Sequence, residues 1–169
     1  MPEYRLDSLA YDVMHKSVLL DTNVLVGAFD PEDSNHEEAR FFIDESQYQL
    51  LVPLAVIVEA WGFLVGSRKK WNLGFEMLAW LNTPGRAIII ASKGDNIPEV
   101  QGLAQIIEKL DCVDAVLVLL SEEIRLKCGF SAGPPIATYD LRDFYKLAPK
   151  VKAGLKVLTV DSEQEIPLN

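Results

Sequence analysis

The sequence predicts a single α/β domain in which helices cover both faces of a mainly parallel sheet. The chain has 169 residues, of which 49% are hydrophobic and 24% are charged. That size supports one sizeable core and is too small for two ordinary domains. Short apolar runs alternate with longer segments in which apolar residues recur at helical spacing. This alternation is typical of parallel strands joined by crossover helices.

The alternation extends over residues 17–160, which we expect to form the folded domain. Residues 1–16 mix charged and aromatic side chains without a clear period. They are predicted to be an N-terminal extension that lies on the surface or forms a short helix. Residues 161–169 are predicted to be an acidic C-terminal tail. The sequence contains no linker, low-complexity tract or internal repeat that would divide the domain.

Apolar runs with the length and composition of buried strands lie at residues 17–20, 49–52, 86–91, 135–138 and 155–160. Pro53 ends the second run and is suited to open the helix that follows it. Helices are predicted at residues 22–29, 36–47, 53–65, 67–81, 98–110, 112–127 and 140–147. In the helix at 67–81, Trp71, Phe75, Leu78 and Ala79 recur at helical spacing. Asn, Thr, Pro and Gly at 82–85 end that helix.

Isolated acids stand against these apolar elements at four separate points. Glu59 is the only charged residue in the run 52–65, Asp21 follows the first strand, and Asp114 interrupts the apolar run 112–120. Asp140 and Asp143 follow the strand at 135–138. An unpaired carboxylate in such surroundings is costly. Because ligands bind at the carboxyl ends of parallel strands, we expect these acids to converge there.

A shared carboxylate site is suited to a hard divalent cation such as Mg²⁺. Such a cation activates water near neutral pH and offsets the charge that builds on a phosphate in the transition state. The acids therefore predict phosphodiester hydrolysis, with no His, Ser or Cys nucleophile required. The sequence after Asp21 lacks the second Asp of a haloacid-dehalogenase motif, which argues against a phosphoaspartate enzyme.

In order along the chain, the motifs resemble those of the PIN-domain family. They read Leu20-Asp21-Thr22-Asn23, Val58-Glu59-Ala60, Asp114-Ala115 and Thr138-Tyr139-Asp140-Leu141-Arg142-Asp143-Phe144, within residues 17–160. The resemblance implies a three-layer α/β/α sandwich and a Mg²⁺- or Mn²⁺-dependent endoribonuclease. It also implies, for many bacterial and archaeal members, a toxin of the VapC type that an antitoxin holds inactive.

On this resemblance, Asp21, Glu59, Asp114 and Asp140 are the predicted catalytic metal ligands, and Asp143 is a further candidate ligand. Thr22, Asn23 and Thr138 are candidates for orienting these carboxylates through hydrogen bonds. Simpler roles stay open at this stage. Asp21 is also a favoured helix N-cap, and Thr22 and Asn23 suit an ordinary turn. Asp111 lies three residues before Asp114, and we assign Asp111 to the helix cap and Asp114 to the metal.

Arg68, Lys69 and Lys70 are candidate contacts to RNA phosphates, with Trp71 available to stack on a base. A run of charges is more often a solvated face, and the spacing of Trp71 is that of a core residue. Arg142 either contacts the scissile phosphate or pairs with Asp140. His15 and His36 have no partners at zinc-ligand spacing.

The formal net charge of −9 argues against nucleic-acid binding through bulk positive charge, although local basic patches can still hold RNA. Cys112 and Cys128 lie at opposite ends of one predicted helix, too far apart to form a disulfide. With no signal peptide and no long apolar run, we expect a cytoplasmic protein without a membrane segment. We also expect a homodimer, because Trp71, Phe75 and Trp80 add much apolar surface to one helix.

Two other function classes remain as alternatives. The first is a catalytically silent PIN scaffold that binds RNA or protein, although none of its expected acids is replaced here. The second is a receiver-like signalling domain, against which the acid on a mid-chain apolar helix argues.

Overall fold

The computed structural model describes residues 11–91, 97–105, 107, 111–150 and 155–168. Within these residues, one six-stranded sheet has the order β3-β2-β1-β4-β5-β6. The strands are β1 (Ser17–Leu20), β2 (Gln49–Pro53), β3 (Ile88–Ile90), β4 (Ile136–Ala137), β5 (Lys156–Leu158) and β6 (Glu165–Pro167). All pairs are parallel except β5 with β6, which is antiparallel. A mainly parallel sheet is confirmed.

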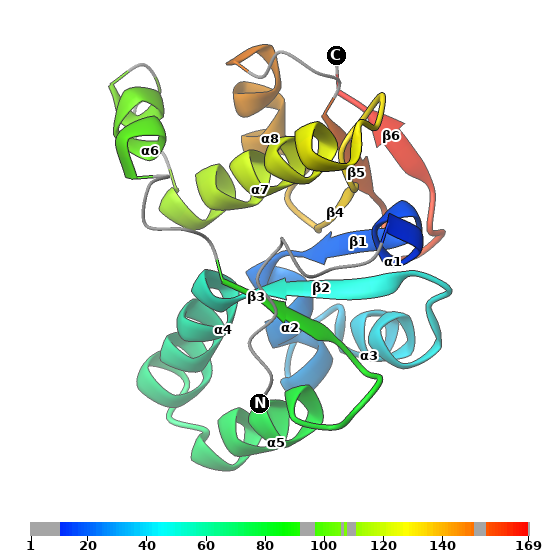
Figure 1. Ribbon diagram of the computed structural model, residues 1–169. Coiled ribbons are helices and arrows are strands. Elements are labelled where there is room, and N and C mark those ends of the chain that lie inside the picture. The colour runs from blue at the N-terminus through cyan, green and yellow to red at the C-terminus, as the bar shows by residue number, and fades with distance from the viewer. Residues whose placement is uncertain (1–10, 92–96, 106, 108–110, 151–154, 169) are drawn as a thin grey trace.

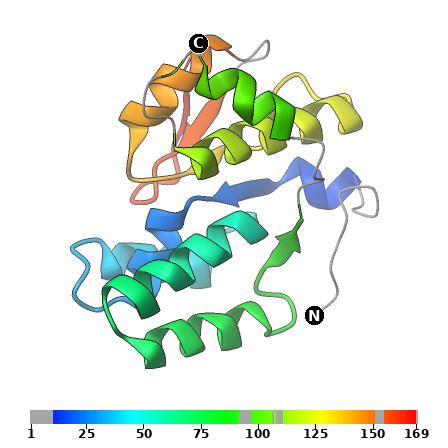
Figure 2. The same cartoon turned by 90° about the vertical axis from the view of Figure 1, so that its left-hand side faces the viewer.

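Helices cover both faces of this sheet (Figure 1). One layer contains α2 (Thr22–Phe29), α3 (His36–Glu45), α4 (Leu54–Trp61) and α5 (Trp71–Leu81), and the opposite layer contains α6 (Ile97–Ala104), α7 (Cys112–Cys128) and α8 (Leu141–Leu147). The view turned by 90° shows the same two layers with the strands between them (Figure 2). A short helix, α1 (Tyr11–His15), leads into β1, and a 3₁₀ turn, η4 (Ala148–Lys150), follows α8. The three-layer α/β/α sandwich is therefore confirmed.

The central strands are buried on both faces, which explains why they are apolar throughout rather than alternating. Every residue of β1 is buried, and Leu19 pairs with Leu51 of β2 and with Ile136 of β4. Phe42 of α3 and Phe144 of α8 are fully buried in the core, on opposite sides of the sheet. The core thus holds the carboxyl ends of β1 and β4 in fixed relation.

The helix predicted at 67–81 begins instead at Trp71. A π-helical turn, η2 (Gly62–Ser67), continues α4, and Lys69 then adopts a left-handed backbone with φ of 58°. Because this conformation cannot continue a helix, residues 68–70 form a turn. Trp71, whose spacing suggested a core residue, is 62% exposed, so that expectation is wrong. Phe75 is 63% exposed, whereas Trp80 is buried.

Other boundaries shift by a few residues. The helix at 36–47 ends at Glu45, and α6 covers Ile97–Ala104 of the predicted 98–110, of which residues 106 and 108–110 lie outside the described residues. Strand β6 forms within 161–169, where no strand was predicted. The strand could not be recognised in the sequence because Ile166 is flanked by Glu165 and Pro167, which gives no strand pattern. Of the predicted extension, residues 11–15 form α1 and residues 1–10 lie outside the described residues. Within the described ranges, no helix is both long enough and apolar enough to span a bilayer.

Candidate active site

The five predicted acids line one cleft of about 290 Å³ at the carboxyl end of the sheet, whereas Thr138, Arg142 and the basic run 68–70 lie outside its lining. Asp21 follows β1, Glu59 comes from α4, Asp114 lies in the first turn of α7, and Asp140 and Asp143 come from the start of α8. Thr22, Asn23, Val26, Asp33, Phe63 and Asp111 complete the lining. The fold therefore brings together all five acids that the sequence singled out, from four separate segments.

Asp21 is the most deeply buried of these acids, with 5% of its surface exposed. The backbone N–H of Thr22 donates to its Oδ1 at 2.6 Å, and the Thr138 hydroxyl donates to its Oδ2 at 2.6 Å. The first contact is the N-cap of α2, so the helix-cap role is confirmed and coexists with a place in the cleft. Both oxygens accept hydrogen bonds, which favours the ionised carboxylate.

The buried Thr138 hydroxyl connects the ends of β1 and β4. It accepts hydrogen bonds from the Asn23 side-chain amide at 3.1 Å and from the Asp140 N–H at 3.0 Å. Its single hydrogen is therefore available for Asp21. The Asn23 side-chain oxygen in turn accepts from the Tyr139 N–H at 3.2 Å. Asn23 and Thr138 thus fix the position of the Asp21 side chain relative to the Asp140 backbone.

Glu59 is held across the cleft by Thr22, whose hydroxyl donates to its Oε2. The surrounding helix is not buried as expected: Val58 is 64% exposed and Leu54 is also exposed. Only the face of α4 that carries Val56, Ile57 and Ala60 packs on the core. The Glu59 carboxylate therefore stands at the border between the core face and an apolar outer face.

Asp111 caps α7, as the sequence predicted, and Asp114 lies in the first turn of that helix. One oxygen of Asp111 accepts from the N–H groups of Val113 and Asp114 at 2.7 and 3.4 Å, which caps α7. Burial, followed by the charges of Asp21 and Asp111, raises the pKa of Asp114 to about 8. Burial likewise raises the pKa of Asp21 to about 6, against the opposing hydrogen bonds from Thr138 and Thr22. The cleft thus concentrates negative charge without compensation at its centre.

Asp140 and Asp143 sit at the rim and are partly compensated. Asp140 caps α8 through the N–H of Arg142, and the Arg142 guanidinium lies 3.8 Å from its other oxygen. The side chain of Arg142 is 80% exposed, so it is accessible to a ligand as well. A hydrogen bond from Lys146 lowers the pKa of Asp143. Asp143 therefore has a cationic partner that the deeper acids lack among the residues lining the cleft.

The donor set fits a hard cation, because the described residues that line the cleft are rich in carboxylates and include no Lys, Arg or His. Among the described residues, no three acids, histidines or cysteines stand close enough to form a ready-made ion site. The hydrogen bonds around Asp21 make it the most firmly placed of the candidate ligands.

The basic run after η2 contacts an acid that sequence reasoning missed. The Asp30 side chain is fully buried at the end of α2 and accepts from Lys70 at 2.7 Å. Lys70 also pairs with Glu32 at 2.7 Å, and the Arg68 Nε lies 3.8 Å from Asp30. Burial pushes the pKa of Asp30 up, but the hydrogen bond from Lys70 and the other contacts outweigh it and the net pKa is lowered. Asp30 follows a buried helix much as Asp21 follows a buried strand. This position after an apolar element is the sequence signal that could have identified Asp30.

Phe63 was also missed, although it follows Glu59 by four residues and such pairs share a helical face. The two histidines have structural contacts: His36 Nδ1 lies 2.8 Å from the Gly27 carbonyl, and the His15 ring packs edge-on against Phe130. Cys112 and Cys128 are free thiols, as their placement predicted.

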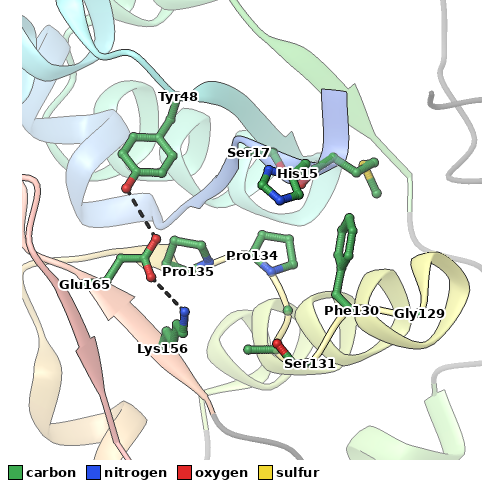
Figure 3. Close-up of a pocket in the computed structure, with 13 residues that line it drawn as sticks. His15, Ser17, Tyr48, Gly129, Phe130, Ser131, Pro134, Pro135, Lys156 and Glu165 are labelled. Atoms are coloured by element: carbon green, nitrogen blue, oxygen red, sulfur yellow. Dashed lines mark hydrogen bonds and ion pairs between the residues drawn. The ribbon is translucent and has the colours of Figure 1, made fainter. Parts of the chain in front are cut away.

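A second cavity, of about 450 Å³, lies at the opposite, amino-terminal edge of the sheet (Figure 3). Its lining includes Tyr48, Phe130, Lys156 and Glu165. Glu165 accepts from the Tyr48 hydroxyl at 3.3 Å and from Lys156 at 2.8 Å, as the dashed lines in Figure 3 mark. Here each charged side chain has a partner of opposite charge.

Comparison with known proteins agrees with this architecture. No curated protein sequence matches the chain. Among solved structures, the Mycobacterium tuberculosis toxin VapC20, described as cleaving the sarcin-ricin loop, is similar with a TM-score of 0.61 and 14% identity, over 77% of this chain and 95% of that one. A chain of a toxin-antitoxin complex from Klebsiella pneumoniae is similar with a TM-score of 0.50 and 20% identity, over 76% of this chain and 90% of that one. At these identities the likeness concerns the fold.

The sequence profile of the PIN domain matches residues 18–165, which includes every acid of the cleft and most of the sheet. The match begins in β1 and ends at the first residue of β6. With the three-layer fold and the convergence of the motif residues already described, the chain belongs to the PIN domain family.

Proposed function

We propose that the protein is a metal-dependent endoribonuclease that hydrolyses phosphodiester bonds. The observation that carries this proposal is the convergence of acids from four segments on one cleft around Asp21, in a PIN domain. Asp21, Glu59, Asp114 and Asp140 are the proposed catalytic acids, with Asp143 as a further ligand at the rim. Mg²⁺ or Mn²⁺ is the proposed cofactor, since both accept several carboxylate oxygens.

A divalent ion in this cleft would supply an activated water and would offset charge on the phosphate. The chain's own residues hold the acids ready for that chemistry. Thr138 and the Thr22 N–H fix the Asp21 carboxylate, while the Thr22 hydroxyl holds Glu59. Asn23 locks Thr138 in the orientation in which it donates to Asp21. Such hydrogen bonds reduce the reorganisation that ion and substrate binding would demand.

RNA is the proposed substrate, and its phosphates need cations outside the acidic cleft. Arg142 is well placed for this role, because its exposed guanidinium lies beside Asp140 at the rim. Of the basic run, Lys70 is held at 2.7 Å by both Asp30 and Glu32, whereas Arg68 lies 3.8 Å from Asp30 and its side chain is 41% exposed. Arg68 and Lys69 are therefore the better candidates. A local cationic rim around a negative cleft is compatible with the overall charge of −9.

The direct test is incubation of the purified protein with a single-stranded RNA, with Mg²⁺, with Mn²⁺ and with EDTA. We expect internal cleavage with either ion and none with EDTA. Cleavage that persists in EDTA would rule out metal-dependent hydrolysis. A protein that binds RNA with either ion but never cleaves it would instead fit the silent PIN scaffold.

We further propose that the protein is the toxin of a toxin-antitoxin pair in the cytoplasm. The described toxin function of the similar VapC20 and the toxin-antitoxin complex of the Klebsiella structure support this. The two free thiols fit a reducing compartment. Expression of the active protein alone should arrest growth, whereas an inactive cleft variant should not. Normal growth during expression of soluble, RNA-cleaving protein would contradict a toxin role.

We also propose a homodimer, but the residues that would form its contact differ in part from those that the sequence suggested. Trp71, Phe75 and Leu78 lie along one exposed stripe of α5, while Trp80 is buried and takes no part. An uncovered stripe of this kind suits a self-complementary contact. Light scattering at micromolar concentration should give a dimer mass. The Phe75→Glu variant should give a monomer mass, and a parent that is already monomeric would contradict the proposal.

A further inference from the structure

Among the described residues that line the acidic cleft, Phe63 is the only aromatic side chain. It lies in the π-helical turn η2, one turn beyond Glu59, and 38% of its surface is exposed. π-helical turns are rare and frequently occur at functional sites. More than a third of the Phe63 surface is therefore open to a ligand in a cleft that is otherwise lined mainly by polar groups.

The Phe63 ring has a cation held against it. The guanidinium carbon of Arg68 lies 5.2 Å from the ring centroid, in a cation–π contact. The Arg68 Nε lies 3.8 Å from the buried carboxylate of Asp30, whose other oxygen is held by Lys70. One oxygen of Asp30 is buried without a hydrogen-bond partner in the described structure, so the Arg68 guanidinium is its nearest compensation. This attraction restrains Arg68 beside the ring.

The turn that carries Arg68 is built tightly. Its N–H donates to the Phe63 carbonyl at 2.9 Å, and the Lys70 N–H donates to the Leu64 carbonyl at 2.9 Å. Lys69 between them holds a left-handed backbone that non-glycine residues rarely adopt, which persists only where the surroundings impose it. Phe63, Arg68 and Asp30 therefore form one anchored unit at the edge of the cleft.

We propose that Phe63 and Arg68 form a platform that receives one base of the RNA next to the acidic cleft. The base stacks on the Phe63 ring, and the Arg68 guanidinium meets an adjacent phosphate. This proposal rests on the proposed ribonuclease function and assigns the stacking role to Phe63, where the sequence suggested Trp71. Trp71 is turned away to pack edge-on against Trp61, and it does not line the cleft.

A nucleobase fits this platform better than a protein side chain does. Single-stranded RNA is commonly held by bases that stack on aromatic rings, with cations tracking the phosphates. The remaining cleft lining is mostly carboxylates and Thr or Asn, which offers little apolar surface to a protein anchor. A platform of this kind orients the strand and is tolerant of sequence, because every base has a flat face.

The test measures binding of a single-stranded oligoribonucleotide to the catalytically inactive Asp21→Asn protein, with and without a second substitution. Phe63→Leu keeps an apolar side chain and removes the ring, Phe63→Trp keeps a ring, and Phe41→Leu is the matched control on an exposed ring of α3. We expect Phe63→Leu to weaken binding about tenfold, the magnitude typical of one stacked base. Phe63→Trp and Phe41→Leu should bind as the Asp21→Asn protein does.

A second arm uses the same oligonucleotide with each position made abasic in turn. One abasic position should weaken binding to the Asp21→Asn protein about tenfold and leave binding to the Phe63→Leu double variant unchanged. Arg68→Gln should reduce the dependence of binding on salt by about one phosphate contact. Equal binding by the Phe63→Leu and parent proteins would overturn the platform, as would an abasic effect of the same size in both.

In otherwise wild-type protein, Phe63→Leu should raise KM for RNA about tenfold and change kcat little. A loss confined to kcat would assign Phe63 to supporting Glu59 and overturn the platform. The two proposals fail separately. If the wild-type protein does not cleave RNA but shows the base-dependent binding, the nuclease proposal fails and the platform stands. If it cleaves RNA with no dependence on Phe63, the platform alone fails.

Discussion

The two edges of the sheet carry charged side chains in opposite arrangements. At the amino-terminal edge, Glu165 is neutralised by Lys156 and hydrogen-bonded by Tyr48 (Figure 3). At the carboxyl edge, Asp21 and Asp114 lie in a cleft whose lining, in the part of the chain that the structure describes, contains further acids and no cationic residue. Both cavities are framed by the same strands. Of the two edges, only the carboxyl edge has acids, Asp21 and Asp114, without a cationic partner among the described residues that line the cleft.

The difference indicates that the charges at the carboxyl edge lower the stability of the fold. Like charges that are partly buried raise one another's pKa and oppose folding, whereas an opposite pair does not. The pKa values of Asp21 and Asp114 are raised, whereas Lys156 and Glu165 form an ion pair at 2.8 Å. Strain of this kind is retained where a ligand relieves it. Substitutions at the two edges should therefore affect activity and stability in opposite ways.

The largest expected effect is on activity. Asp21→Asn removes the charge of the most firmly held acid, so RNA cleavage should fall at least about a hundredfold, the scale of losing one electrostatic group from an active site. Glu165→Gln at the opposite edge should leave cleavage unchanged. Rates on a labelled RNA with Mn²⁺ test both, with circular dichroism to check the fold. If both variants lost activity equally, the contrast between the edges would not be functional.

The second effect concerns stability and pH without metal. The folded-state pKa values of about 6 for Asp21 and about 8 for Asp114 lie above the ordinary value of 3.8, so the folded protein binds these protons more tightly than the unfolded chain. Stability should therefore fall as pH rises from about 4 to 8. Asp30 and Asp143 have lowered pKa values and lose their contribution in acid, below that window.

Asp114→Asn should flatten this decline. In EDTA at pH 8 the variant should melt several degrees above the parent. At pH 5 the difference should be much smaller, because Asp114 is then protonated in the folded parent and only its ionisation in the unfolded chain still opposes folding. Asp143→Asn is the control, since the Asp143 carboxylate of the parent is stabilised by Lys146. Thermal melts across pH 5–8 measure the effect. A parent whose melting temperature is flat over this range would refute the charge stress in the cleft.

The acids themselves were predictable because each interrupts an apolar run. Asp21, Glu59, Asp114 and Asp140 were found from that contrast, and the order of strands and helices followed from composition. Thr138 could be chosen from its motif, but its part in joining Asn23, Asp21 and Asp140 depends on side-chain directions across β1 and β4. Local sequence does not carry that information.

The rest could not be predicted because it depends on which faces the fold covers. The α4 run is apolar all round, so its pattern did not reveal that Val58 faces outward. Lys70 looked like a solvated charge, yet its partner Asp30 lies 40 residues away in the sequence. Strand β6 is created by pairing with β5 rather than by its own residues. Long-range pairing decides each of these features.

A smaller effect is expected at Glu59, which is exposed and held mainly by Thr22. Glu59→Gln removes one negative charge near Asp21 and Asp114 and keeps the hydrogen-bond acceptor. In EDTA it should melt a degree or two above the parent. Added Mn²⁺ should raise its melting temperature less than that of the parent, because a candidate ligand is gone. A variant that melts lower in EDTA and responds fully to Mn²⁺ would make Glu59 a structural carboxylate.

The smallest effect is expected at the compensated edge. The Lys156 and Glu165 side chains are each about one third exposed, and an ion pair of that kind contributes at most about 1 kcal/mol. Lys156→Met should therefore lower the melting temperature by no more than about 2–4 °C. The loss should shrink in high salt, which screens the parent's ion pair, and Mn²⁺ should stabilise the variant as much as the parent. A Lys156→Met protein with an altered Mn²⁺ response would show that the two edges are coupled through the strands, and the independence on which the comparison rests would fail.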